Sequence, residues 1–159
     1  MADIKTADEV LETWLNHAHS MEEAIVKVLE AHRKDADGQP EVVAKIEEHL
    51  EKTRHHVQLV TARMKELDFE VSRTKKAIAQ AAGSMRGFTT GQPSEKLIKN
   101  SIDEYSTEYM EIGVYQTIKA VAEGLDDALT VEMCDTIIPE EQEMADWLEE
   151  NLPDLVQKT

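Results

Sequence analysis

Apolar residues recur along this chain in alternating steps of three and four positions, over four separate stretches. This spacing is typical of amphipathic helices that bury one face in a helical bundle. It predicts helices over about 7–35, 40–68, 95–123 and 126–150, and therefore an all-α protein. The second stretch carries an unbroken series, which consists of Val43, Ile46, Leu50, Thr53, Val57, Val60, Met64 and Leu67.

Polar residues at the ends of these stretches support the predicted helix starts. Thr6 and Glu9 have the spacing of a capping box, which satisfies backbone N–H groups at the start of a helix. Ser94 is suited to cap the third helix, and Asp126 or Asp127 is suited to cap the fourth. The chain is therefore expected to form four helices of nearly equal length.

The connections between the predicted helices indicate their arrangement. Short loops join the first helix to the second and the third to the fourth, which favours two antiparallel hairpins. Residues 69–93 form a much longer crossover, with a weak helical piece at about 74–82. This connectivity predicts a ferritin-like four-helix bundle that forms a single domain over 1–159. An up-down-up-down bundle is the alternative, although it would not need so long a crossover. The fourth helix is expected to end near Glu150, before Pro153.

Two glutamates lie where apolar side chains would be expected on the third and fourth helices. Glu108 precedes Ile112 by four residues and Glu141 precedes Ala145 by four, so each lies on an otherwise apolar face. An ionised carboxylate in a core is costly unless a cation neutralises it. If the four helix midpoints share one level, further polar side chains meet there, namely Glu22, His49, Thr53, His56 and Glu111.

A cluster of carboxylates and imidazoles in the centre of a bundle is typical of a metal site. Two divalent cations would neutralise four glutamates, and carboxylate with histidine suits iron or manganese. We therefore predict two such ions as cofactors. The expected ligands are Glu22, His49, Glu108, Glu111 and Glu141, with Thr53, His56 and Tyr115 as supporting residues.

Each of these residues also has an ordinary structural interpretation. Glu22 flanks its apolar face and could be a solvated side chain. His49 and His56 lie seven residues apart on one flank, where water or a nearby glutamate often satisfies a histidine. Glu104 is expected at an exposed or interface position, and Tyr115 is expected to pack in the core.

Composition narrows the classes of function. The formal net charge of −16 argues against a nucleic-acid partner, because phosphate backbones attract basic surfaces. No apolar run approaches the roughly 20 residues of a membrane span, and no signal peptide opens the sequence, so we expect a cytoplasmic protein without a membrane partner. The single cysteine, Cys134, lies on an apolar face and is expected to fill core space.

Several segments resemble the bacterial YciE/YciF-type branch of the ferritin-like superfamily. They are residues 19–23, 49–56, 108–117 and 136–141, and the segment on the third helix is the most specific. The resemblance implies a ferritin-like bundle, often dimeric, with a di-metal site. By position, the ligands that it implies are Glu22, His49, Glu108, Glu111 and Glu141.

The sequence also departs from the ferritin and rubrerythrin pattern, which places Glu-x-x-His on the second and fourth helices. Here the residue three positions after Glu141 is Met144 rather than histidine, and the residue three positions after Glu51 is Arg54. His56 stands where relatives tend to carry glutamine.

Two functions of different classes remain open at this point. The first is a di-metal protein with a role in oxidative or osmotic stress, acting on dioxygen or peroxide as an oxidase, peroxidase or catalase-like enzyme, and forming a homodimer. The second is a metal-free helical bundle that serves as an interaction or stress-adaptor module. A carrier of lipid or small molecules is a third, for which no specific motif is present.

Overall fold

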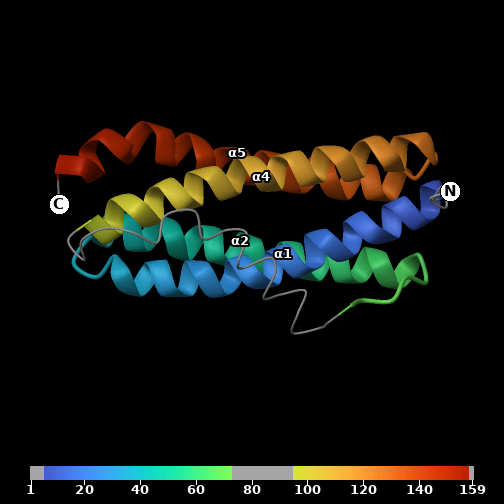
Figure 1. The fold of residues 1–159 in the computed structure, drawn as a ribbon, viewed down its shortest axis with the longest axis horizontal. Coiled ribbons are helices and arrows are strands. Elements are labelled where there is room, and N and C mark those ends of the chain that lie inside the picture. The colour runs from blue at the N-terminus through green and yellow to red at the C-terminus, as the bar shows by residue number, and fades with distance from the viewer. Residues whose placement is uncertain (1–5, 73–94, 158–159) are drawn as a thin grey trace, which may run out of the picture.

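The structure, a computed structural model, describes residues 6–72 and 95–157, and within these ranges it contains helices and no strands. The helices pack side by side as a long four-helix bundle (Figure 1). The all-α prediction is therefore confirmed. The four helices are α1 (Ala7–Asp35), α2 (Pro40–Glu66), α4 (Lys96–Gly124) and α5 (Ala128–Gln157).

The connectivity follows from where each helix begins and ends. The chain reverses direction between α1 and α2, and again between α4 and α5, so each pair is an antiparallel hairpin (Figure 1). The helix α2 ends at one end of the bundle, and α4 begins at the other (Figure 1). An up-down-up-down bundle would start α4 beside the end of α2, so the ferritin-like arrangement is the one present. The expected short helix at 74–82 lies outside the described residues, as does Ser94.

Local capping explains two of the helix starts. Thr6 and Glu9 form the predicted capping box, with the backbone N–H of Thr6 donating to Glu9 Oε2 at 2.7 Å. Asp127, rather than Asp126, caps α5, because its Oδ1 accepts a hydrogen bond from the backbone N–H of Thr130 at 3.1 Å. Asp126 instead takes a left-handed turn with φ of 55°. Side-chain capping is thus present at the starts of α1 and α5, whereas the residue before α2, Gln39, makes no such bond.

The last helix is longer than its sequence predicts. It continues through Pro139 and Pro153 to Gln157, so the expected end near Glu150 is wrong. A proline inside a helix removes one backbone hydrogen bond and crowds the preceding turn. The extra turn nevertheless buries Leu155, which is 2% exposed, and this burial offsets part of that cost.

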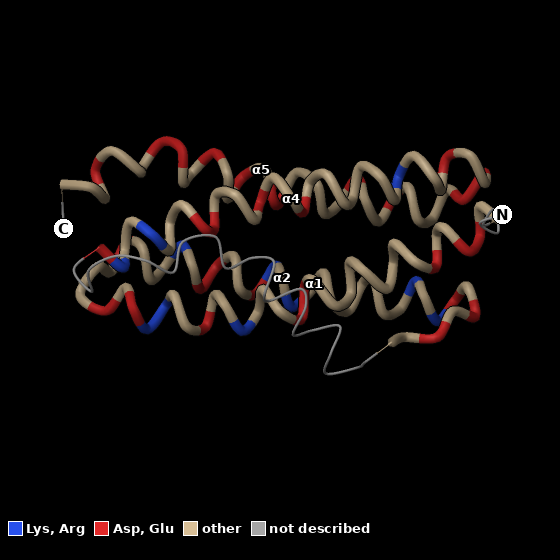
Figure 2. Tube along the Cα trace, in the orientation of Figure 1, with Lys and Arg blue, Asp and Glu red and all other residues tan. Residues whose placement is uncertain are grey.

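The core consists of apolar layers on both sides of a polar centre. Leucine, isoleucine and methionine side chains fill the two ends of the bundle, and Cys134 lies fully buried among them, as expected. Acidic positions occur along all four helices (Figure 2). None of the described helices is long and apolar enough to cross a membrane. Among the described residues, thirteen polar or charged ones are nevertheless buried, and about half of these lie together in the middle of the bundle.

Candidate metal centre

The polar centre is made of carboxylates and imidazoles that all four helices contribute. Each helix presents its polar residues at mid-length, so the side chains meet at one level, as the sequence predicts. None of the side chains is more than 1% exposed. They are Glu22 from α1, His49 and His56 from α2, Glu108 and Glu111 from α4, and Glu141 from α5.

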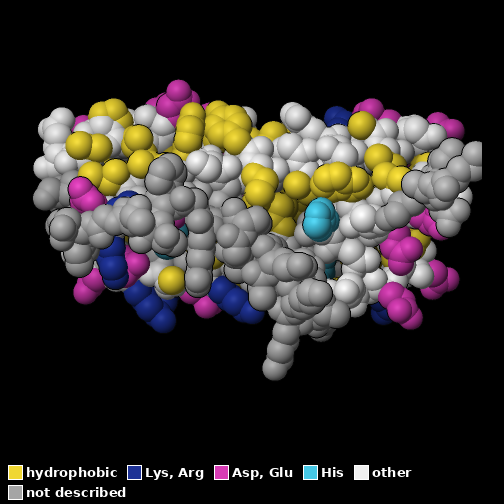
Figure 3. All heavy atoms as spheres, in the orientation of Figure 1, with side chains coloured by type: hydrophobic (Ala, Val, Ile, Leu, Met, Phe, Trp, Pro, Cys, Tyr) yellow, Lys and Arg dark blue, Asp and Glu magenta, His cyan; other side chains and the backbone are white. Residues whose placement is uncertain are grey.

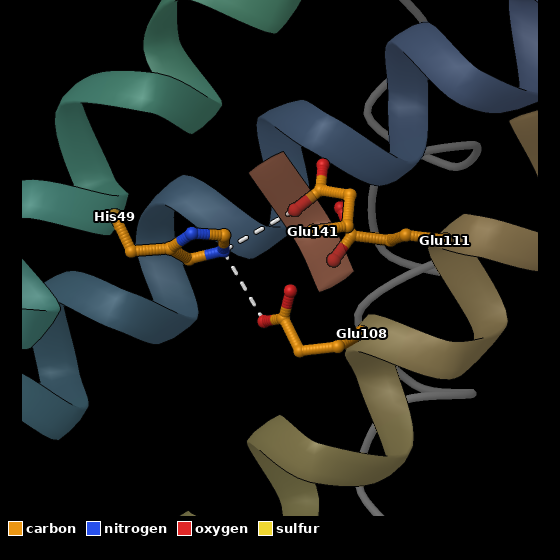
Figure 4. A group of neighbouring side chains, drawn as sticks. All are labelled: His49, Glu108, Glu111 and Glu141. Atoms are coloured by element: carbon orange, nitrogen blue, oxygen red, sulfur yellow. Dashed lines mark ion pairs between the residues drawn. The ribbon is translucent and has the colours of Figure 1, made fainter. Parts of the chain in front are cut away.

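One group within this centre consists of His49, Glu108, Glu111 and Glu141. Each residue offers one ligand atom, and these atoms all lie within 4.8 Å of one another. The Nε2 atom of His49 is 3.2 Å from Glu108 Oε1 and 3.4 Å from Glu141 Oε2. Figure 4 shows the three carboxylates gathered on the side of the ring that carries this nitrogen. A single ion between them would be held by groups from three helices.

A second group shares one member with the first. Glu22, His56 and Glu141 also place one ligand atom each within 4.8 Å of the others. The Nδ1 atom of His56 is 2.9 Å from Glu141 Oε1 and 3.6 Å from Glu22 Oε1. The two oxygens of Glu141 therefore face different imidazoles, and this residue joins the two groups.

Many of the polar atoms in the centre have no hydrogen-bond partner among the described residues. Leaving a buried polar group unsatisfied costs about 1–3 kcal/mol, and more if it is charged. Native proteins contain few such groups, so a cluster of them is a place where a bound ion or water would supply the missing partners. The atoms concerned are Glu22 Oε2, His49 Nε2, His56 Nδ1, Glu108 Oε2 and both oxygens of Glu111 and Glu141.

The carboxylates in this centre are difficult to ionise together. Burial raises the pKa of Glu108 and of Glu111 well above the usual value, and repulsion by Glu141 adds to the effect. Burial also raises the pKa of Glu22. Burial alone would raise the pKa of Glu141, but His56, His49 and a hydrogen bond with Glu108 together outweigh it, and the pKa is lowered. The protein alone therefore favours the ionised form at Glu141 and disfavours it most strongly at Glu108 and Glu111.

The two histidines differ in their electrostatic environment. Burial lowers the pKa of His49, so its ring is neutral. Burial alone would also lower the pKa of His56. The adjacent carboxylates of Glu141 and Glu22 outweigh it and raise the pKa of His56 to about 11. His56 is therefore the cation that balances Glu141 when no metal is bound.

Residues expected to support the ligands take different roles. Tyr115 is fully buried and donates its hydroxyl hydrogen to Glu22 Oε1. Thr53 donates to the backbone carbonyl of His49 at 3.0 Å, within its own helix, rather than to a ligand side chain. Glu104, expected at an exposed or interface position, is only 5% exposed and lies 2.6 Å from His32 Nδ1, so it is buried within the bundle instead. This contact joins α4 to α1.

Sequence reasoning missed Glu140. Its Oε2 atom lies 2.6 Å from His56 Nε2, on the side of the ring that faces away from the centre. The only signal in the sequence was its position directly before Glu141. His56, expected as a supporting residue, is fully buried and belongs to the second group itself. Met144 is also fully buried, and neither of the two groups includes it.

Solved structures of bacterial proteins share this fold. A protein from Xanthomonas campestris has 23% identity and a TM-score of 0.80, covering 95% of this chain and 94% of its own. The Escherichia coli stress protein YciF has 19% identity and a TM-score of 0.79, with 98% and 100% covered. A dodecameric thioferritin from Bacteroides fragilis, described as bacterioferritin-related, has 25% identity and a TM-score of 0.76, with 96% and 89% covered.

The sequence comparison agrees with these structures. The match to a family runs over residues 6–159, which is nearly the whole chain and includes every residue of both groups. The resemblance to the YciE/YciF-type branch of ferritin-like proteins is thereby confirmed. The chain belongs to the DUF892 family, which is described as a domain of unknown function.

Proposed function

We propose that this protein binds two divalent metal ions, iron or manganese, between its four helices. The observation that carries the proposal is the convergence of buried ligand atoms that have no hydrogen-bond partner. His49, Glu108, Glu111 and Glu141 would hold one ion, at the first cation position. Glu22, His56 and Glu141 would hold the other, at the second cation position.

The charge of the centre supports two ions rather than one. Glu22, Glu108, Glu111 and Glu141 carry four negative charges when ionised, which two divalent cations would neutralise. Metal binding would also displace the protons that burial favours on Glu108 and Glu111, because ligands bind in their deprotonated form.

The type of ligand supports iron or manganese. Carboxylate oxygen and imidazole nitrogen suit these metals, whereas thiolate-rich sites select zinc or copper. The thiol of Cys134 belongs to neither group. When bound, such a pair of ions supplies redox chemistry toward dioxygen or peroxide. The protein's own contribution is to orient Glu22 through Tyr115 and to keep bulk water out with the apolar layers at both ends.

We extend the proposal to the biological setting. A role in oxidative or osmotic stress, in the cytoplasm, is in keeping with the name of the similar stress protein YciF. We also propose a homodimer, since apolar side chains gather over α4 and α5 on the face in Figure 3. Tyr109, Leu129 and Val156 are exposed by 45%, 58% and 52%. Light scattering in solution would test for twice the chain mass of 18.0 kDa.

Metal analysis of protein purified without chelator tests the proposal. We expect two iron or manganese ions per wild-type chain, and anomalous scattering at the two metal edges would identify them. Glu108→Ala should lose the ion at the first position, and Glu141→Ala should lose both, because Glu141 serves both groups. Glu150→Ala, which removes an exposed carboxylate from the same helix, is the control. The same low metal content in all four proteins would contradict the proposal.

A further inference from the structure

His56 lies between carboxylates on both sides of its ring. Its Nδ1 atom faces the centre, 2.9 Å from Glu141 Oε1 and 3.6 Å from Glu22 Oε1. Its Nε2 atom faces outward, 2.6 Å from Glu140 Oε2, which is within hydrogen-bond distance. Each ring nitrogen therefore has its own carboxylate neighbour.

The two carboxylates at opposite sides of the ring come from consecutive residues of α5. Neighbouring residues on a helix point about 100° apart, since one turn takes 3.6 residues. Glu141 therefore points into the centre and is fully buried, while the side chain of Glu140 reaches α2 from the surface and is 32% exposed. Between them they contact both nitrogens of one imidazole.

This arrangement decides which nitrogen is available to a cation. A neutral imidazole has one N–H donor and one lone pair, and only the lone pair can bind a metal. If Nδ1 carried the hydrogen, it would donate to Glu141 and offer nothing to a cation. With the hydrogen on Nε2, donated to Glu140, the lone pair of Nδ1 points into the second group. Histidines that bind metals commonly donate their other ring hydrogen to a carboxylate in this way.

We propose that Glu140 is a positioning residue for the second cation position. It accepts the Nε2 hydrogen of His56 and so keeps the Nδ1 lone pair directed at the metal. The inference rests on the proposed function and deepens it, because it makes one of the two cation positions depend on a carboxylate at the protein surface. The first position does not depend on Glu140, because His49 faces that position through Nε2 and contacts other glutamates there.

Titration of the metal-free full-length protein with Zn²⁺ in a calorimeter tests the inference. The wild type should bind two ions. Glu140→Ala should weaken binding at one position about 10–100-fold, the usual effect of losing such a partner, and leave the other unchanged. Glu140→Gln should retain most of the affinity, since its amide oxygen still accepts the Nε2 hydrogen. Circular dichroism would verify that each variant is folded.

Two further measurements separate positioning from a general effect of charge. Glu143→Gln is the matched control, because Glu143 also links α5 to α2, through Lys45 and Lys52 at 2.8 Å each. It should bind both ions like the wild type. Nitrogen NMR of Zn²⁺-loaded protein with labelled histidine should show His56 bound through Nδ1 and protonated at Nε2. This signature should be lost in Glu140→Ala.

The possible outcomes are distinct. Unchanged Zn²⁺ affinity in Glu140→Ala would overturn the inference, and so would a Glu140→Gln variant as weak as Glu140→Ala. In the second case the charge, rather than the hydrogen bond, would be responsible. A wild-type protein that binds fewer than two ions would contradict the proposed function itself, and this inference with it.

Discussion

Glu141 is the residue on which both groups of the centre depend. Its Oε2 atom is 3.4 Å from His49 and its Oε1 atom is 2.9 Å from His56, and the residue has no exposure to solvent. A carboxylate without water needs a positive partner or a hydrogen-bond donor. Tyr115 meets the same requirement at Glu22, where its fully buried hydroxyl is the donor.

The hydroxyl of Tyr115 can be tested separately from the metal. Tyr115→Phe removes the donor to Glu22 and keeps the ring that fills the core. We expect the free energy of unfolding to fall by about 1–3 kcal/mol, the range for a buried hydrogen bond to a charged or unsatisfied group. Urea denaturation in the presence of chelator measures the change.

Tyr109→Phe is the matched control for this measurement, on the same helix. Its side chain is 45% exposed and packs edge-on against Tyr105. Removing an exposed hydroxyl should change stability by no more than about 0.5 kcal/mol. Equal losses in the two variants would mean that the Tyr115 hydroxyl contributes nothing specific to the centre.

The sequence predicts part of this centre at the level of residues. Aligning the helix midpoints brought Glu22, His49, Glu108, Glu111 and Glu141 together, because that step depends only on helix length. The roles of His56, Glu104 and Glu140 did not follow from it. The contacts of these three residues depend on how far each helix is rotated about its own axis, which a shared level does not determine. That rotation is set by packing against neighbours and leaves no local pattern.

At the scale of elements, the heptad spacing located all four described helices, and the capping residues located the starts of α1 and α5. The end of α5 was predicted too early, because a local rule treats Pro153 as a stop. The burial of Leu155 against the rest of the core overrides that rule. Helix existence is thus a local property of this chain, whereas the end of a helix can be a tertiary one.

The start of α5 gives a prediction about pH. Burial alone would raise the pKa of Asp127, but hydrogen bonds from Thr130 and Arg63 outweigh it and lower the pKa below 3.8. Arg63 Nη2 lies 2.7 Å from Asp127 Oδ1, so the ion pair also joins α2 to α5. A lowered pKa stabilises the fold above the unfolded value, and this stability is lost as pH falls through the folded value.

Asp127→Asn tests this contribution, because it keeps the helix cap and removes only the charge. We expect a loss of about 1 kcal/mol at about pH 7, the difference between charged and neutral hydrogen bonds. The loss should shrink as the pH falls below 3.8 and through the lowered pKa of Asp127, because the wild-type carboxylate then becomes protonated as well. Asp126→Asn is the control, since its left-handed conformation also tolerates asparagine. A loss that does not depend on pH would contradict the ion pair as its cause.

At the scale of the whole molecule, the polar centre divides the apolar core into two parts. A protein without metal has to bury at least one charged pair there, at His56 and Glu141. Bound cations would raise the free energy of unfolding, because anything that binds only the folded state stabilises it. Stability and metal content are therefore expected to change together.

Thermal unfolding with and without chelator tests this coupling. Metal at about 1,000 times its Kd should add about 4 kcal/mol, which corresponds to a melting temperature higher by about 8–16 °C for a chain of this size. Glu141→Leu should abolish the response to metal, because both cation positions use Glu141. If chelator has no effect on the wild type, and Glu141→Leu melts at a higher temperature, the metal-free adaptor hypothesis is favoured instead.

The crossover connectivity has a consequence for how the centre assembles. The hairpin of α1 and α2 supplies both imidazoles and Glu22, whereas the hairpin of α4 and α5 supplies the other three carboxylates. Neither hairpin alone contains either complete group. Either cation position is therefore complete only when the two hairpins have docked, and a bound ion would stabilise that docking. Metal uptake would then report the last step of folding, rather than the formation of the helices.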